Sequence, residues 1–131
     1  MILLDTHVWI WYVQDEERLP KQHRKLIERH VTSGLGVSSF SFWEVAKSAK
    51  LGRLALPVPV RDWLEMASTY PGIVILPITP GIATESADLP GLFHRDPADQ
   101  IIVATARVYE IELLTFDAKI LNYEHVKLAK P

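Results

Sequence analysis

"MILLDTHVWIWYV" (Met1–Val13) joins a short apolar run, an acid and an apolar helical pattern without a break. Residues 2–4 predict a short buried strand, and residues 6–13 predict a helix. Asp5 stands at the junction, where Asp is among the preferred N-cap residues. A strand that leads directly into a helix is the unit from which parallel α/β sheets are built.

The rest of the chain repeats this unit. Further strands are predicted by apolar runs at residues 35–39, 72–78 and 111–116, with a last edge strand at 125–129. Helices are predicted by apolar spacing and by Pro and Gly boundaries at residues 20–34, 42–52, 61–70, 80–89, 96–109 and 117–121. This alternation predicts an α/β fold in which helices cover both faces of a parallel sheet.

Composition narrows the class of protein. The chain has 131 residues, 48% of them hydrophobic, which indicates a single domain over residues 1–131 with its own core. It has no cysteine, which excludes disulfides, a thiolate zinc site and a cysteine nucleophile, and fits a reducing cytoplasm. The apolar start lacks a basic flank and contains Asp5, so we expect neither a signal peptide nor a membrane span.

The net charge of −2 bears on nucleic-acid binding. A protein that holds nucleic acid through phosphate neutralisation alone is expected to be basic. If this chain binds nucleic acid, another feature has to attract the phosphates. A bound divalent cation has the required charge.

Acids recur where predicted strands end and helices begin. Besides Asp5, these are Glu44, the pair Asp96 and Asp99, and Asp117. Each has a local alternative as a helix cap or first-turn acid, including a capping box formed by Ser41 and Glu44. In parallel sheets, however, ligands gather outside the carboxyl ends of the strands. Carboxylates converging there repel one another unless a cation is bound, and an all-oxygen cluster suits Mg²⁺ or Mn²⁺.

Four segments in order along nearly the whole chain resemble the PIN domain family, and within it the VapC-like toxins of type II toxin–antitoxin systems. They are "MILLDTHVWIWY", "SSFSFWEVAKSAKLGRL", "HRDPADQIIVATA" and "LLTFDAKI". The resemblance implies a three-layer α/β/α sandwich around a central parallel sheet. It also implies a metal-dependent endoribonuclease that uses Mg²⁺, with Mn²⁺ as a substitute.

The resemblance assigns residues and partners as well. It implies that catalytic, metal-ligating acids stand at Asp5, Glu44, Asp99 and Asp117, with Asp96 as an additional metal-site acid. The implied partners are an RNA substrate, a protein antitoxin and a second copy of the chain, with no membrane. Relatives often carry Arg where this chain has Gln100, so a contact made by that Arg is in doubt.

Five further residues are candidates for orienting the substrate. The hydroxyl of Thr6 or Thr115 could hold a water or a phosphate oxygen, and local bonding to the backbone is the alternative. His94, Arg95 and Lys47 could contact RNA phosphates, the alternative being solvated surface charge.

The aromatic residues have a structural interpretation. We expect Trp9, Trp11, Trp43 and Trp63 to anchor the core and interfaces rather than to stack on bases. An apolar helix over residues 6–13 could also bury a subunit or partner surface.

Two other functions compete with the nuclease. In a phosphotransfer protein, Asp5 would accept a phosphoryl group. The residue two positions after it is His7 instead of the acid that such phosphatases carry, and the early acidic pair of a receiver is absent. A PIN-like module that binds without cleaving is the other alternative, and the presence of all four acids argues against it.

Overall fold

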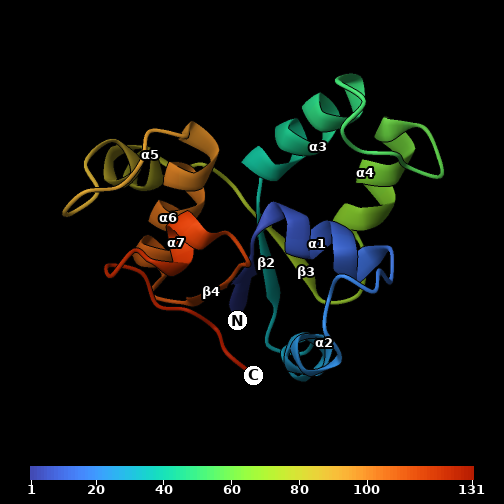
Figure 1. Ribbon diagram of the computed structural model, residues 1–131, viewed down its shortest axis with the longest axis horizontal. Coiled ribbons are helices and arrows are strands. Elements are labelled where there is room, and N and C mark those ends of the chain that lie inside the picture. Colours follow the sequence, from blue (N-terminus) through green and yellow to red (C-terminus); the bar gives the residue numbers. More distant parts are fainter.

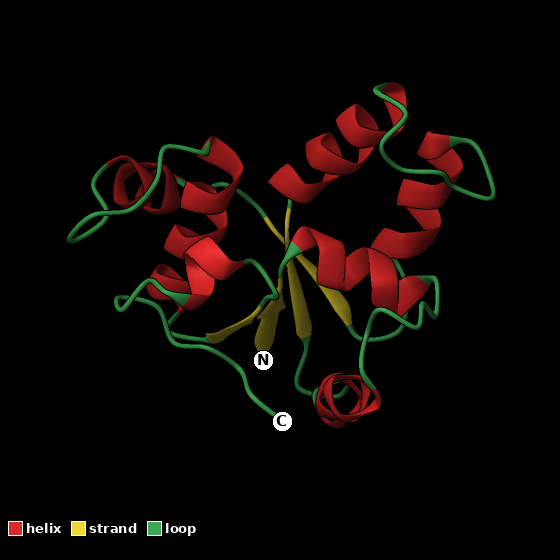
Figure 2. Ribbon diagram, viewed as in Figure 1, coloured by secondary structure: helices red, strands yellow, loops and turns green.

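Four short strands form one parallel sheet at the centre of the computed structural model, which describes residues 1–131 (Figures 1 and 2). The strands are β1 (Ile2–Leu4), β2 (Leu35–Ser38), β3 (Ile73–Leu76) and β4 (Glu112–Leu114). Their order across the sheet is β3-β2-β1-β4, and every neighbouring pair is parallel. The expected α/β fold is confirmed.

The strand order creates a crevice beside β1. The chain moves outward from β1 to β2 and β3, and then returns to place β4 on the other side of β1. The order therefore reverses between β1 and β4. In open α/β sheets, the carboxyl ends of the strands at such a reversal form the usual ligand site.

Helices cover both faces of this sheet (Figure 1). On one side lie α1 (Thr6–Val13), α2 (Lys21–Arg29), α3 (Phe40–Lys50) and α4 (Val60–Ser68). On the other side lie α5 (Pro80–Ala87), α6 (Pro97–Tyr109) and α7 (Ala118–Leu121). None of these helices combines the length and hydrophobicity needed to cross a bilayer.

Alternate residues of β1 serve two separate cores. Leu4 packs with Trp9 and Trp63 on the side of α1 to α4. Leu3 packs with Ile102 on the side of α6. Because successive side chains of a strand point to opposite faces, a three-residue strand anchors both layers. It thereby fixes the position of Asp5, the next residue.

Three local expectations are wrong. The helix predicted to run to Gly34 ends at Arg29, because the chain must turn before β2 and Gly34 adopts a φ of 115° that favours glycine. The predicted last edge strand is reduced to one bridge, between Leu113 and Leu128. The expected capping box does not form, because α3 already begins at Phe40 and Ser41 lies inside it.

Candidate metal centre

Asp5 is a buried carboxylate with both oxygens bonded. It is the N-cap of α1, and the residue is only 4% exposed. Oδ1 accepts a hydrogen bond of 2.8 Å from the Thr6 N–H, and Oδ2 accepts one of 2.7 Å from the Thr115 hydroxyl. A buried charge is tolerated only when it is paired or hydrogen-bonded, so these two donors hold the carboxylate in one orientation.

Glu44 approaches Asp5 from the second turn of α3. The Thr6 hydroxyl donates to Glu44 Oε1 at 2.5 Å and lies 2.7 Å from the Ser41 hydroxyl. Because the Thr6 hydroxyl has one proton, Ser41 is the donor to Thr6 in this chain of bonds. Burial raises the pKa of Glu44 to about 7, and the charges of Asp5 and Asp96 add to the rise, against the opposing effect of the Thr6 bond.

Asp96 and Asp99 occupy the start of α6. Asp96 is the N-cap, and its Oδ1 accepts a bond of 3.1 Å from the Asp99 N–H, with Pro97 at the first helical position. Burial raises the pKa of Asp99 to about 7. The charges of the other acids raise it further, in the order Asp5, Asp117, Asp96 and Glu44. Asp99 is therefore electrostatically coupled to every other acid of the group.

His94 faces Asp99 from the loop before α6. Its Nε2 lies 3.0 Å from Asp99 Oδ2, although the ring N–H is not aligned for a hydrogen bond. Its Nδ1 accepts a bond of 3.4 Å from the Asp96 N–H. When the ring is neutral, its proton is therefore on Nε2, the nitrogen nearer the carboxylate.

Asp117 lies at the end of β4, where it caps α7. Its Oδ1 accepts a bond of 2.9 Å from the Lys119 N–H, and its own N–H donates to the Thr115 hydroxyl at 3.0 Å. His7 supports the same loop from α1, because its Nε2 accepts a bond of 3.0 Å from the Phe116 N–H. The other nitrogen of His7, Nδ1, lies 3.8 Å from Asp5 Oδ2.

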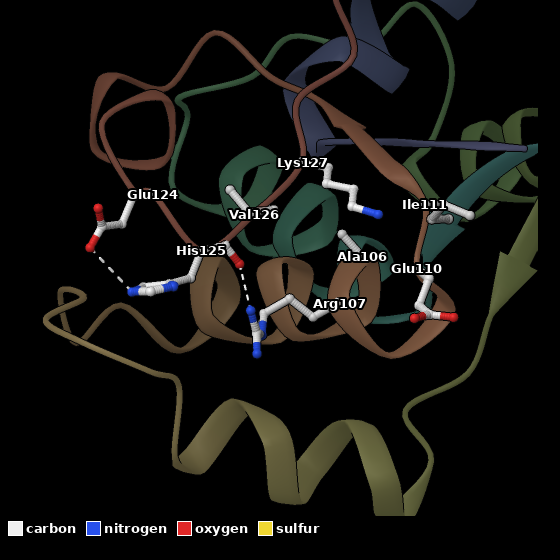
Figure 3. A pocket seen from close by; sticks show the side chains of 8 residues that line it. All are labelled: Ala106, Arg107, Glu110, Ile111, Glu124, His125, Val126 and Lys127. Atoms are coloured by element: carbon white, nitrogen blue, oxygen red, sulfur yellow. Dashed lines mark hydrogen bonds and ion pairs between the residues drawn. The ribbon is translucent and has the colours of Figure 1, made fainter.

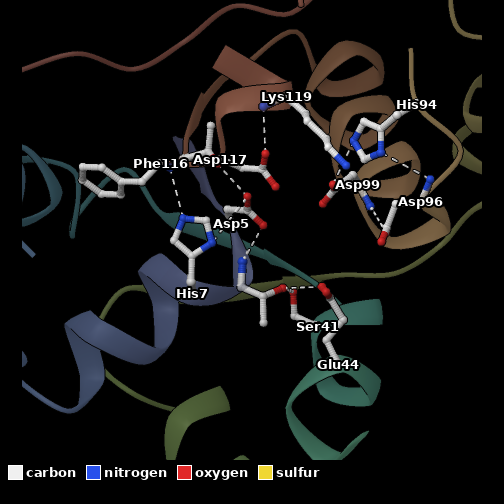
Figure 4. A network of polar contacts seen from close by, with 12 residues as sticks. Asp5, His7, Ser41, Glu44, His94, Asp96, Asp99, Phe116, Asp117 and Lys119 are labelled. Atoms are coloured by element: carbon white, nitrogen blue, oxygen red, sulfur yellow. Dashed lines mark hydrogen bonds and ion pairs between the residues drawn. The ribbon is translucent and has the colours of Figure 1, made fainter. Parts of the chain in front are cut away.

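The acids face one pocket of about 310 Å³ (Figure 4). Its lining residues are Asp5, Thr6, His7, Ile10, Glu44, Ser48, Asp96, Asp99 and Asp117. They come from the ends of β1 and β4, from α1 and α3, and from the start of α6. Five carboxylates around one cavity, two of them with strongly raised pKa values, form an anionic site at the reversal of the strand order.

Comparison with known proteins identifies the family of this chain. Residues 2–126 match the PIN domain family. The chain belongs to the PIN domain family. It is also 33% identical over 124 residues to Ribonuclease VapC22 of Mycobacterium tuberculosis. The matched residues cover 95% of this chain and 92% of that protein.

Solved structures share the PIN fold of this chain. VapBC2 from Rickettsia felis, bound to a DNA fragment from its promoter, matches with a TM-score of 0.71 and 15% identity, over 98% of each chain. A toxin–antitoxin complex from Klebsiella pneumoniae matches with a TM-score of 0.61 and 19% identity, over 96% of this chain and 95% of that one. At such identities the likeness concerns the fold alone.

Not every candidate residue of this PIN domain lines the acid pocket. Thr115 is buried beneath Asp5, and its hydroxyl is used inside the protein instead of facing the pocket. Lys47 lies in a neighbouring groove. Arg95 is exposed outside the pocket and forms no ion pair.

Sequence reasoning missed three lining residues, His7, Ile10 and Ser48. A single histidine after the first strand has no metal-ligand spacing to single it out. Ser48 follows Glu44 by four residues on α3, so helical periodicity was the available signal.

The donor set of this pocket suits a hard cation. All its acids and hydroxyls offer oxygen, the element that Mg²⁺ and Mn²⁺ prefer. No three of its His, Asp or Glu side chains lie close enough to ligate one ion directly. Because Mg²⁺ retains several waters and is commonly held by one or two carboxylates, the wide pocket fits a hydrated ion.

A second hollow, of about 380 Å³, lies at the other end of α6 (Figure 3). Its one arginine, Arg107, is already engaged: Nε donates to Glu85 Oε1 at 2.7 Å and Nη1 donates to the His125 carbonyl at 2.6 Å. These contacts tie α6 to α5 and to the C-terminal segment. We assign the hollow no chemistry.

Proposed function

We propose that this chain is the ribonuclease toxin of a toxin–antitoxin pair, and that it hydrolyses RNA phosphodiester bonds with a divalent cation. The observation that carries this proposal is the pocket in which Asp5, Glu44, Asp96, Asp99 and Asp117 meet. Its position on a PIN fold, and the similarity to Ribonuclease VapC22 along nearly the whole chain, support RNA as the substrate.

The acids divide into holding and proton-accepting roles. Asp5, fixed by two hydrogen bonds, and Asp117 would hold the cation at the reversal point of the sheet. When bound, Mg²⁺ or Mn²⁺ would neutralise part of the negative charge of the phosphate and lower the pKa of a water bound to the cation. Glu44 and Asp99 have pKa values of about 7, so either can accept the proton of the attacking water near neutral pH. The water oxygen then bonds to phosphorus, and the bond from phosphorus to the leaving oxygen breaks with its electron pair on that oxygen, which takes up a proton from solvent.

The phosphotransfer alternative finds no support in the surroundings of Asp5. Phosphatases that use such an aspartate carry a second acid two residues later. Here that position is His7, whose Nε2 accepts a hydrogen bond from the Phe116 N–H. Incubation with a small labelled phosphodonor is therefore expected to leave the protein unlabelled.

The partners proposed are an antitoxin and a second copy of the chain. The similarity in fold to toxin–antitoxin complexes supports the first. The second is supported by the exposed Val74 and Ile78 at the β3 edge of the sheet. Helix α1, considered as an interface from its sequence, is instead mostly buried within the chain. Light scattering of the purified chain measures the dimer, and rescue of bacterial growth by the cognate antitoxin tests the pair.

The decisive experiment is a cleavage assay. The purified chain is incubated with total RNA and with single-stranded oligoribonucleotides in Mg²⁺, Mn²⁺ or EDTA. We expect cleavage with either cation and none with EDTA. Binding without cleavage under all three conditions would instead support the non-catalytic module.

A further inference from the structure

A groove of about 410 Å³ opens next to the acid pocket. Its lining residues are Phe40, Trp43, Glu44, Lys47, Ser48, Leu51, Arg53, Asp96, Pro97 and Ala98. Glu44, Ser48 and Asp96 also line the acid pocket. The two hollows therefore share a rim. A linear polymer bound in one hollow has room to continue into the other.

Two stripes of side chains on helix α3 border the groove, and one of them also borders the acid pocket. Glu44 and Ser48, four residues apart, line both the acid pocket and the groove. Trp43 and Lys47, also four residues apart, line only the groove. Residues at this spacing lie one above the other on a helix, so each pair forms a stripe along α3. The rotation between the stripes places an aromatic and a cation beside the acids.

Trp43 does not belong to the core, so of the core and interface roles expected from the sequence it can have only the second. It is 56% exposed, whereas Trp9 and Trp63 are fully buried. Its ring lies 5.4 Å from that of Phe40, with an angle of 33° between the planes. The pair forms an aromatic platform at the entrance to α3.

The cations of the groove are free. Lys47 and Arg53 are exposed, and neither forms an ion pair with any residue of the chain. They stand next to a pocket whose five carboxylates repel phosphate. Unpaired cations at the edge of an anionic site attract a polyanion that the site itself repels.

We propose that this groove binds the single-stranded RNA next to the bond that is cut. Trp43, backed by Phe40, stacks on one base, and Lys47 and Arg53 neutralise neighbouring phosphates. Aromatic platforms beside cations are the usual means of holding single-stranded nucleic acid without reading its sequence. The proposal rests on the proposed ribonuclease function, because it places the adjoining phosphate in the acid pocket.

Charge favours RNA over the other occupants of an exposed aromatic surface. A second copy of this chain carries a net charge of only −2, whereas RNA carries one negative charge for each nucleotide. RNA offers a phosphate for each cation and a flat base for Trp43. Continuity with the acid pocket, through Glu44, Ser48 and Asp96, also fits the substrate.

The test compares two probes in EDTA, where the proposed cleavage is stopped. One is a short labelled oligoribonucleotide, and the other is the same ribose–phosphate chain without bases; fluorescence anisotropy measures both dissociation constants. Trp43→Ala is expected to weaken binding of the first probe about tenfold, and to leave the abasic probe unchanged. Trp43→Phe should restore most of the loss. Tyr109→Ala, an exposed aromatic at the far end of α6, is the matched control and should change neither constant.

Lys47→Gln tests the electrostatic half of the proposal. The substitution should weaken the binding of both probes equally. It should also reduce the magnitude of the slope of the logarithm of the binding constant against the logarithm of salt concentration by about 0.7. The unmodified protein also gives an answer without any substitution, because it should bind the probe with bases more tightly than the abasic one.

Three results would overturn the proposal. The first is equal binding of the two probes by the unmodified protein. The second is wild-type affinity for the oligoribonucleotide in Trp43→Ala. The third is a Trp43→Ala variant whose oligomeric mass changes while its affinity for RNA does not. The last would assign the groove to a contact between copies. Failure of the ribonuclease function gives a different pattern: no RNA is cut in Mg²⁺ or Mn²⁺, while Trp43 still governs binding.

Discussion

The Thr115 hydroxyl donates a hydrogen bond of 2.7 Å to Asp5 Oδ2 across a sequence separation of 110 residues. The Thr115 hydroxyl oxygen also accepts a bond of 3.0 Å from the Asp117 N–H. One buried hydroxyl thus connects the ends of β1 and β4 at the reversal of the strand order. It sets the positions of two acids while making no direct contact with the pocket.

Thr115→Val removes this hydroxyl and keeps the shape of the side chain. Because a hydrogen bond to a charged group contributes about 1.5–3 kcal/mol, we expect the free energy of unfolding to fall by that amount. Binding of Mg²⁺, measured by calorimetry, should weaken because Asp5 is no longer held. Thr115→Ser keeps the hydroxyl and is the matched control. Wild-type stability and Mg²⁺ affinity in the valine variant would show that the bond has no role in the site.

Asp5→Asn removes a charge without changing the volume of the side chain. Asn caps a helix about as well as Asp, so circular dichroism should remain that of the wild type. RNA cleavage in Mg²⁺ should fall about 100-fold or more, because stabilisation by the cation amounts to several kcal/mol in the transition state.

Asp62→Asn serves as its control. It makes the same change in the first turn of α4, at an exposed site outside the acid pocket. Its cleavage rate should match that of the wild type. Full activity in Asp5→Asn would reduce Asp5 to a helix cap.

The acids predict an unusual dependence of stability on pH. Folding raises the pKa of Glu44 from 4.5 to about 7 and that of Asp99 from 3.8 to about 7, with burial as the main cause. Between these values the folded chain holds more protons than the unfolded chain. The contribution of both groups to stability is therefore fully present below about pH 4, and is lost as the pH rises to about 7.

Thermal melts in EDTA should show this trend: the contribution of Glu44 and Asp99 to Tm should fall as the pH rises from about 4 to about 7. Mg²⁺ should raise Tm most above pH 7, where Glu44 and Asp99 are ionised and their charges attract a cation to the pocket. Asp99→Asn should flatten the slope in EDTA. An equal Tm gain from Mg²⁺ at low and high pH would show that the ionisation of these two acids does not affect cation binding.

The placement of the acids was predictable from sequence to different degrees. Asp5 and Asp117 directly follow apolar runs, so their position at strand ends needed only the local pattern. The position of Glu44 is harder to predict. The expected capping box pairs it with the nearby Ser41, whereas its hydrogen-bond donor in the structure, Thr6, lies 38 residues away. Contacts between distant segments depend on strand order, which the pattern of one segment does not encode.

Trp43 illustrates what periodicity could have supplied. Ser41 and Val45 are buried and four residues apart, so they define the inner face of α3. Trp43 lies midway between them and must project outward. Its aromatic character alone indicates an anchor in the core or at an interface, and its place on the helix excludes the core.

The pair Asp96 and Asp99 should separate in function. Asp96 is the N-cap of α6, and its Oδ1 accepts a hydrogen bond of 3.1 Å from the Asp99 N–H. Because Asn caps a helix about as well as Asp, Asp96→Asn should change the free energy of unfolding by only about a few tenths of a kcal/mol. Its cleavage rate should drop slightly, since Asp96 stands at the rim of the pocket.

Asp99→Asn should behave differently on both counts. A first-turn acid that acts only on the helix dipole is worth about 0.3–1 kcal/mol, so a purely structural Asp99 would lose little. As a metal-site acid coupled to every other carboxylate, its loss should cut RNA cleavage about 100-fold or more. The stability of the metal-free variant above pH 7 should rise, because a carboxylate repelled by its neighbours is gone. Cleavage assays beside melts with and without Mn²⁺ measure both effects. Near-wild-type cleavage in both variants would make the two acids helix-start residues only, and a loss confined to Asp96→Asn would reverse their roles.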